Sequence, residues 1–229
     1  MSIATLILGE SGTGKSTSLR NLDPTKTLLI QVISKPLPFR SKDWQYFSQS
    51  CPTGNVFISD NADQICQVMQ KTKREIIVID DFQYLMANEF MRRAKDKGYD
   101  KFTEIGLHAW QIFDLAGKLA PHKRVYILSH TQSDDVGRTK IKTIGKMLDE
   151  KITLEGIVTI CLRTNVSDGR YTFATQNNGA DTVKSPMGLF GSQYIDNDLK
   201  LVDDAICEYW GIEAPTEQPE TTQPQENNE

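Results

Sequence analysis

The chain has 229 residues, of which 38% are hydrophobic and 24% are charged, and its net charge is −4 at pH 7. This length and composition suit one α/β core of ordinary size, and no apolar run is long enough to span a membrane. The charge is uneven, because residues 213–229 contain five glutamates and no lysine or arginine, which leaves the rest of the chain at +1. We therefore predict a cytoplasmic protein with one core over residues 1–212 and a disordered acidic tail over residues 213–229.

A phosphate-binding motif, G-x-x-x-x-G-K-[ST], runs without substitution from Gly9 to Ser16. The apolar run 3–8 before it suits a buried strand, and residues 15–21 after it can form a helix that ends before Pro24. The glycines of such a loop turn backbone N–H groups toward phosphates, the lysine adds a positive charge, and the serine hydroxyl can bind Mg²⁺. The motif predicts binding of ATP with Mg²⁺ by Gly9, Glu10, Ser11, Gly12, Thr13, Gly14, Lys15, Ser16 and Thr17.

Strands and helices alternate along the rest of the chain. In chain order, the expected segments are a strand at 27–33, a strand at 55–59, a helix at 61–73, a strand at 75–81, two helical stretches, a strand at 123–129, strands at 157–163 and 171–176, and a helix at 198–210. Turn residues 166–169 separate two of these strands and predict an antiparallel hairpin. The pattern predicts an α/β fold, with a mostly parallel sheet, helices on both faces and the hairpin at one edge.

The strand at 75–81 ends in two adjacent acids, Asp80 and Asp81. Its four β-branched residues are typical of a central parallel strand, and Mg²⁺ needs a carboxylate opposite the serine hydroxyl of the phosphate loop. We predict that Ser16 and Asp80 hold the metal ion and that Asp81 activates or positions the attacking water. The alternative is a buried strand whose following turn happens to be acidic.

The order of these motifs resembles the ATPase core of the RecA-type recombinases and the related replicative helicases. The resemblance covers roughly residues 1–210 and includes a strand that ends in Tyr126-Ile127-Leu128-Ser129-His130-Thr131, followed by a basic loop and a hairpin. In those families a polar residue at this strand end contacts the γ-phosphate and begins a mobile DNA-binding loop. The resemblance therefore implies a γ-phosphate sensor at His130; the alternative is a histidine that is merely satisfied at the edge of the strand.

The loop 137–146 alternates basic residues with Thr and Ile. In an extended backbone, alternate side chains share one face, and a row of cations on one face suits a polyphosphate backbone. The alternative is an exposed hairpin that its lysines keep soluble. A second basic group, at 92–101, lies where the family has its other DNA loop, but a solvated helix face explains it better. The residues that we predict to contact single-stranded DNA are Arg138, Lys140, Lys142 and Lys146.

Two features differ from the RecA-type pattern. The segment Lys184-Ser185-Pro186-Met187-Gly188 resembles the K-x-[KR]-x-G stretch with which a neighbouring subunit reaches the γ-phosphate, and Pro186 replaces its second basic residue. The resemblance thus implies a catalytic role for Lys184 in a homo-oligomer, either a ring or a filament. The family also places a glutamate at the end of the strand after the first helix, where residues 31–34 contain no acid. Asp81 is for this reason the candidate base, and slow hydrolysis is compatible with the sequence.

The chain looks like the core-only RecA-type ATPases of bacteriophages, which anneal or recombine single strands. This resemblance implies a Mg²⁺-dependent ATPase that single-stranded DNA stimulates, with a single-strand binding protein as a further partner. Two alternatives stay open: a nucleotide-regulated DNA- or protein-binding module with little turnover, and an AAA+-like helicase loader. A loader needs a helical lid after the core, where only one short helix is expected. A kinase is disfavoured because the arginines that would close a lid over the phosphates are few and dispersed.

Overall fold

The structure is a computed structural model, and it describes residues 1–145 and 147–213. Lys146 and the predicted tail apart from Glu213 lie outside the described residues. The strands of the main sheet are β1 (Ile3–Leu8), β2 (Thr27–Gln31), β3 (Val56–Ile58), β4 (Ile76–Asp80), β5 (Arg124–Ser129), β8 (Ile160–Ser167), β9 (Arg170–Ala174) and β10 (Tyr194–Asp196). Their spatial order is β10-β9-β8-β1-β5-β4-β2-β3. All neighbours from β8 to β3 are parallel, and β9 and β10 extend one edge in antiparallel fashion, which confirms the predicted sheet.

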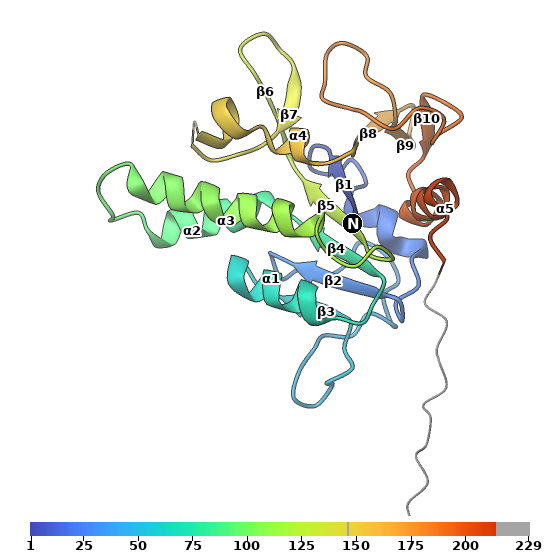
Figure 1. Cartoon of the computed structure of the whole chain (residues 1–229), viewed down its shortest axis with the longest axis horizontal. Coiled ribbons are helices and arrows are strands. Elements are labelled where there is room, and N and C mark those ends of the chain that lie inside the picture. Colours follow the sequence, from blue (N-terminus) through green and yellow to red (C-terminus); the bar gives the residue numbers. More distant parts are fainter. Residues whose placement is uncertain (146, 214–229) are drawn as a thin grey trace, which may run out of the picture.

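Helices cover both faces of this sheet (Figure 1). They are η1 (Ser16–Asn21), a 3-10 helix; α1 (Ala62–Lys71); α2 (Gln83–Arg92); α3 (Asp100–Ala116); η2 (Met147–Ile152), a π-helix; α4 (Leu154–Ile157); and α5 (Leu199–Trp210). Successive strand residues alternate between the faces, so Leu6 and Leu8 pack with α1, α2 and α3, whereas Ile7 packs with η1 and α5. None of the helices in the described ranges is long and apolar enough to cross a bilayer.

The first helix differs from its prediction. The segment 15–21 folds as the 3-10 helix η1, in which the Ser18 N–H bonds to the carbonyl oxygens of both Gly14 and Lys15. Because Pro24 follows so closely, the segment can complete few α-helical hydrogen bonds. By contrast, α5 has the predicted extent, since Asp198 caps its first turn and Gly211, with φ of 60°, ends it.

The hairpin between β8 and β9 forms at the predicted turn. Ser167 pairs with Arg170, so Asp168 and Gly169 make a two-residue loop in which both φ angles are positive, at 50° and 74°. The strand before it starts at Ile160 instead of 157, because the preceding residues fold into η2 and α4 and bury leucines in the core. The predicted basic loop also contains regular structure, since β6 (Thr131–Ser133) and β7 (Thr139–Ile141) form a separate hairpin at the top of Figure 1.

Candidate nucleotide-binding site

The phosphate loop connects β1 to η1 at the edge of the sheet where the parallel strands β1, β4 and β5 end. Thr164 of β8 packs against this loop, and its hydroxyl oxygen lies 2.6 Å from that of Thr13. Only glycine fits at Gly9, because a Cβ atom there would lie 1.9 Å from the Thr164 hydroxyl oxygen. Gly14 has a φ of 95°, which side chains rarely tolerate. The loop backbone is thus fixed by packing against the sheet.

Lys15 folds back over its own loop. Its Nζ atom donates hydrogen bonds to the carbonyl oxygens of Gly9, at 2.9 Å, and Glu10, at 2.8 Å. Burial lowers the pKa of Lys15 to about 8, although the negative charges of Asp81 and Asp80 oppose this shift. A triphosphate offers this ammonium group charged acceptors in place of neutral carbonyls, and charged hydrogen bonds are the stronger ones.

The two predicted metal ligands contact each other. The Ser16 hydroxyl donates to both carboxylate oxygens of Asp80, at 2.9 and 2.8 Å. Asp80 is buried, and this burial, together with repulsion from Asp81, raises its pKa. Within residues 1–145 and 147–213, no cluster of three or more His, Cys, Asp or Glu side chains could hold a metal. A hydroxyl and one carboxylate fit Mg²⁺ in the form in which substrate phosphates and water complete the coordination.

Asp81 faces different partners from Asp80. Its φ of 62° is unusual for a residue with a side chain. The carboxylate forms an ion pair with Lys35 and lies 3.7 Å from Nε2 of His130. Burial opposes ionisation of Asp81, but contacts with His130 and Lys35 outweigh it and hold its pKa below the usual range. Asp81 is therefore ionised beside the phosphate loop, as a base or a water-positioning group must be.

Lys35 is a residue of this site that the sequence analysis missed. It lies in the irregular connector after β2, at the same sheet edge as the acids. Gln31, at the end of β2, pairs in register with Asp80 and donates its Nε2 hydrogen to the carbonyl oxygen of Lys35, at 3.0 Å. A lysine closely following a parallel strand at the edge where the acids lie is the signal that could have found it.

Lys35, Asp81 and His130 line a cavity of about 250 Å³ together with the phosphate loop. A second cavity, of about 470 Å³, adjoins it, and the residues common to both are Gly12, Gly14 and Thr17. The second cavity is lined by Tyr171 and Asn197, from the β9–β10 edge. Asn197 is 3% exposed, and its Nδ2 atom is buried without a hydrogen-bond partner. A flat ring and an unpaired amide suit a nucleoside, and no local pattern in the sequence indicated either residue.

Lys184 lies apart from this cavity in the same chain. Its backbone N–H and C=O pair with those of Cys161 beside β8, at 2.9 and 2.8 Å. Its side chain does not line the cavity that holds Lys15. The resemblance implies that Lys184 reaches the γ-phosphate bound by a neighbouring copy of the chain, and this role stays a prediction.

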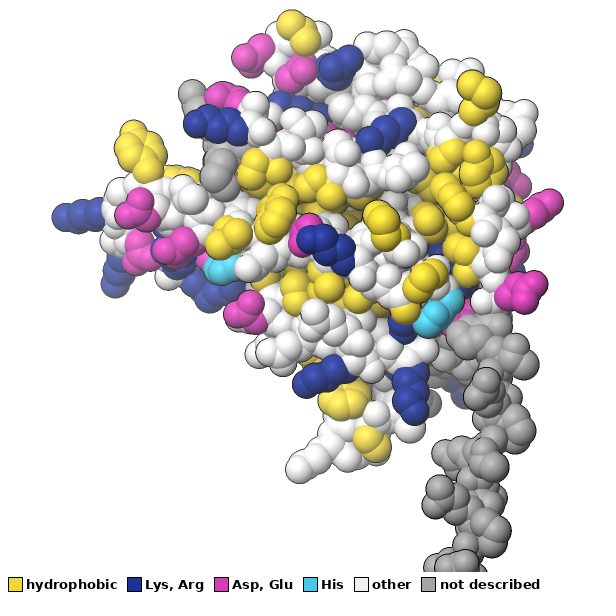
Figure 2. Space-filling model, in the orientation of Figure 1, with side chains coloured by type: hydrophobic (Ala, Val, Ile, Leu, Met, Phe, Trp, Pro, Cys, Tyr) yellow, Lys and Arg dark blue, Asp and Glu magenta, His cyan; other side chains and the backbone are white. Residues whose placement is uncertain are grey.

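Of the described residues that we predict to bind DNA, Arg138 lies in the turn of the hairpin β6–β7, Lys140 lies in β7 and Lys142 follows it. Arg138 and Lys142 are exposed, but Lys140 forms an ion pair with Asp149, in which Nζ and Oδ1 are 2.8 Å apart. On the face seen in Figure 2, acidic and basic side chains are interspersed over the molecule and near the tip of this hairpin. Extended backbone is present only over β7, Thr139–Ile141, and one of the three described cations already has an acidic partner.

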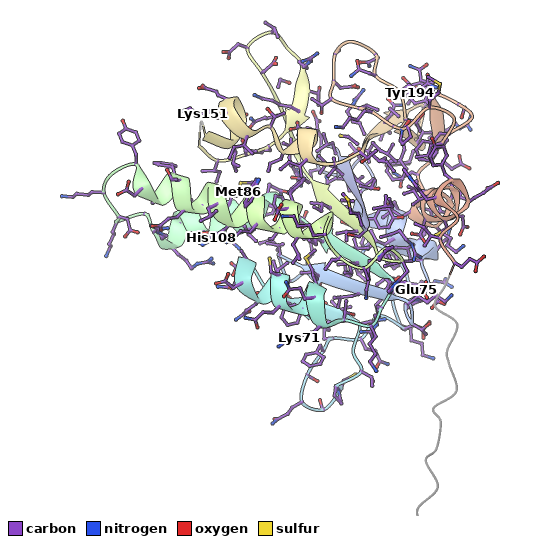
Figure 3. The ribbon with its side chains drawn as sticks, viewed as in Figure 1. Lys71, Glu75, Met86, His108, Lys151 and Tyr194 are labelled. Atoms are coloured by element: carbon purple, nitrogen blue, oxygen red, sulfur yellow. The ribbon has the colours of Figure 1, made fainter. Side chains whose placement is uncertain are left out.

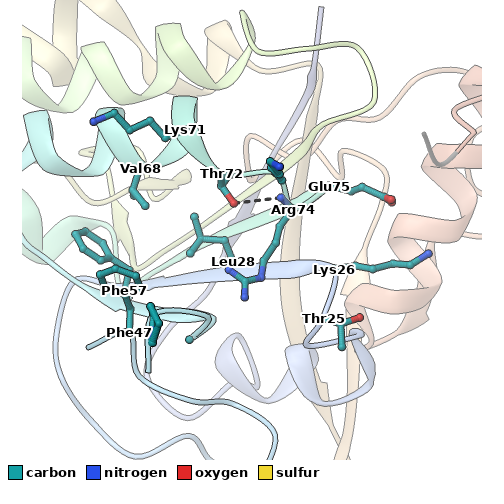
Figure 4. A pocket seen from close by; sticks show the side chains of 13 residues that line it. Thr25, Lys26, Leu28, Phe47, Phe57, Val68, Lys71, Thr72, Arg74 and Glu75 are labelled. Carbon is teal, nitrogen blue, oxygen red and sulfur yellow. Dashed lines mark hydrogen bonds between the residues drawn. The ribbon is translucent and has the colours of Figure 1, made fainter. Parts of the chain in front are cut away.

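A further cavity, of about 550 Å³, opens at the opposite edge of the sheet, where β2 and β4 begin. Lys71, labelled in Figure 3, marks its place in the molecule. Phe47 and Phe57 form one wall, whereas Lys26 and Lys71 point away from them in Figure 4. Arg74 donates to the backbone oxygen of Thr53, at 2.7 Å. This cavity has an apolar wall and no phosphate loop, so the candidate site is the one around Lys15.

No protein-family model matches the chain, and no curated protein matches its sequence significantly. The assignment of a function therefore depends on the geometry of the site.

Proposed function

We propose that this protein binds ATP with Mg²⁺ at the phosphate loop and hydrolyses the terminal phosphate bond. The observation that carries the proposal is the convergence of Lys15, the Ser16–Asp80 pair and the ionised Asp81 around one cavity. These groups come from separate segments of the chain. Lysines and acids are seldom buried unless they are paired or functional, and such clusters in clefts are typical of active sites.

The reaction assigns a task to each residue. Lys15 exchanges its carbonyl partners for phosphate oxygens, and the N–H groups of the loop bind the same phosphates. Ser16 and Asp80 would hold Mg²⁺, which when bound neutralises charge on the β- and γ-phosphates. Asp81 takes a proton from water as the water oxygen bonds to the γ-phosphorus and the bond to the bridging oxygen of ADP breaks. His130 keeps the Asp81 carboxylate in place.

The second cavity supports ATP as the nucleotide. A side-chain amide offers N–H donors, which match a ring nitrogen of adenine, and a carbonyl acceptor, which matches the adenine amino group. Asn197 has such an amide with its Nδ2 atom unpaired, and Tyr171 presents a half-exposed ring in the same cavity. This second cavity meets the cavity around Lys15, which we call the phosphate cavity, at Gly14 and Thr17. A bound nucleotide needs such a connection, because its α-phosphate lies between the nucleoside and the terminal phosphates.

We further propose a RecA-like core that acts on single-stranded DNA in phage recombination or annealing. β5 lies between β1 and β4, so that His130 at its end lies between the phosphate loop and the acids. The N–H of Lys142 donates to the carbonyl oxygen of His130, at 2.8 Å, so the hairpin β6–β7 is bonded directly to the proposed sensor. A strand bound by the hairpin can therefore alter the position of His130 and the rate of hydrolysis. The oligomer and a single-strand binding protein as partner follow from the resemblance alone.

A nucleotide-regulated binding module with little turnover is the second candidate. Two observations favour it: β2 ends in Gln31 instead of an acid, and the Asp81 carboxylate is already paired with Lys35. The loader has less support, since α5 is the only helix after β10 in the part of the chain that the structure describes.

Nucleotide binding and hydrolysis by the Lys15→Ala variant test the proposal. Loss of hydrogen bonds to a charged group costs about 1.5–3 kcal/mol, so ATP affinity should fall about 10- to 150-fold and turnover should be lost. Lys97→Ala, at an exposed site between α2 and α3, is the control and should behave as wild type. Equal ATP affinity in wild type and Lys15→Ala would contradict the proposal. Hydrolysis that rises with single-stranded DNA supports the RecA-like ATPase, and binding without turnover supports the module.

A further inference from the structure

Lys35 lies between the Asp81 carboxylate and the cavity above the phosphate loop. Its ammonium group is paired with the Asp81 carboxylate, and the same side chain lines the cavity above the phosphate loop. The side chain of Asp81 is 4% exposed, whereas that of Lys35 is 40% exposed. One partner of the pair is therefore buried and fixed, and the other has room to move.

The backbone of Lys35 is held while its side chain stays long and open. Gln31, which is 1% exposed, donates to the Lys35 carbonyl oxygen, and the N–H of Val32 donates to the Asp80 carbonyl oxygen at 3.2 Å. Pro36 and Pro38 follow and restrict the connector. The backbone at Lys35 is thus held by hydrogen bonds next to β4. Only the side-chain rotamer of Lys35 needs to change for its ammonium group to reach another anion in the cavity.

We propose that Lys35 is a cation with two positions, which pairs with Asp81 when the γ-phosphate is absent and moves to the γ-phosphate when ATP is bound. This inference rests on the proposed function, because it needs a triphosphate in the cavity. The movement releases Asp81 at the moment when a substrate is present. Lys35 then contacts the γ-phosphate from within the same chain, unlike Lys184, and makes the protein distinguish ATP from ADP.

Electrostatics decides the direction of the exchange. While Lys35 is paired with Asp81, its ammonium group occupies a carboxylate oxygen that an attacking water would need. A γ-phosphate brings more negative charge than one carboxylate and three acceptor oxygens, so it outcompetes Asp81 for Lys35. His130, 3.7 Å away, still orients the released carboxylate. ADP has no group at this position, so Lys35 stays on Asp81 and ADP gains nothing from it.

The affinities of ATP and ADP in Lys35→Met separate this role from a structural one. We expect the affinity for a non-hydrolysable ATP analogue to fall about tenfold, the affinity for ADP to stay unchanged, and kcat to fall, because one charged hydrogen bond to the γ-phosphate is lost. Lys35→Arg keeps the charge and should restore most of the ATP preference. Lys42→Met is the control, since Lys42 is exposed on the same connector, and it should leave both affinities unchanged.

The Asp81→Asn variant gives a test of opposite sign. It removes the competing partner of Lys35, so the affinity for the ATP analogue should rise a few-fold although turnover falls. In the double variant Lys35→Met/Asp81→Asn this gain should vanish. If circular dichroism shows that Lys35→Met is poorly folded, the same affinities are measured in Lys35→Gln and in Asp81→Asn.

The two-position role would be overturned if Lys35→Met kept the wild-type ATP-to-ADP selectivity. It would also be overturned if this variant lost affinity for ATP and ADP equally. In either case the proposed function stands if wild type binds and hydrolyses ATP. If wild type binds neither nucleotide, the proposed function itself fails.

Discussion

The phosphate cavity and the hairpin β6–β7 meet at His130, yet they hold their charges in opposite ways. At the cavity Lys15 and Asp80 are buried and partnered, because Lys15 donates to carbonyl oxygens and Asp80 accepts from a serine hydroxyl. On the hairpin, Arg138 and Lys142 are exposed to solvent. A buried charge is costly unless something compensates it, whereas an exposed charge costs almost nothing. The cavity is therefore strong evidence for a charged ligand, and the hairpin is weak evidence for one.

The ion pair between Lys140 and Asp149 makes the contrast sharper. Asp149 neutralises Lys140, the central cation of the predicted DNA-binding row, with 2.8 Å between Oδ1 and Nζ. Asp149 lies on η2, a helix that the sequence analysis did not anticipate. The spacing of cations along a strand says which side chains share a face, but it does not say which acids the fold brings to that face.

Exchange of the acids in the cavity should have the largest effect. Asp81→Asn should lower kcat about a thousandfold, because a general base contributes about 10²- to 10⁴-fold, and it should not weaken ATP binding. Asp80→Asn should instead lower both turnover and its response to Mg²⁺, since this carboxylate holds the ion.

Steady-state ATPase rates over a Mg²⁺ series measure both variants. Asp135→Asn, at an exposed site on the hairpin, is the control and should match wild type. If Asp81→Asn hydrolyses ATP at the wild-type rate, the base lies elsewhere.

A buried charge outside the cavity tests whether burial alone indicates a ligand. Asp203 of α5 accepts hydrogen bonds from Arg124, at 2.9 Å for both nitrogens, and from the Tyr126 hydroxyl, at 2.6 Å. Asp203→Asn removes the closer of the two carboxylates that pair with the buried guanidinium and leaves only Glu75, at 3.4 Å, so the free energy of unfolding should fall by about 3 kcal/mol. ATP affinity should stay unchanged, because this pair is structural.

Urea unfolding with and without ATP measures the two effects. Asp204→Asn is the matched control, because Asp204 is the next residue and its pair with Lys200 is exposed, so it should cost less than about 0.5 kcal/mol. Equal losses in both variants would show that burial does not set the energy of these pairs.

The sequence predicted the parts of the molecule that local signals determine. The β-branched run before Asp80, the glycines of the phosphate loop and the Asp168-Gly169 turn each specify their own backbone. Lys35 and Asn197 carry no such signal. They belong to the site only because β2 pairs with β4 and because the β9–β10 edge folds back over the phosphate loop. The π-helix η2 was missed for the same reason, since its leucine is buried by tertiary packing.

The smallest expected effect concerns the hairpin. If Arg138 and Lys142 each contact one phosphate of single-stranded DNA, the double alanine variant should lower the slope of log affinity against log salt by about 1.4, since each contact contributes about 0.7. Lys140→Ala should add less, because Asp149 already neutralises it. Asp149→Ala, which frees Lys140, should instead raise the slope toward a third contact.

Oligonucleotide titrations over a salt series measure these slopes. The control is Lys71→Ala/Lys73→Ala, which removes two exposed cations at the opposite edge of the sheet and should leave the slope unchanged. Since the hairpin lies outside the phosphate cavity, ATP binding should be unaffected in every variant, whereas DNA stimulation of hydrolysis should disappear with Arg138 and Lys142. If the double variant keeps the wild-type affinity and slope, the hairpin is not the DNA site. In that case the buried charges of the cavity would be the only ones with a ligand, and the nucleotide-regulated module would be preferred.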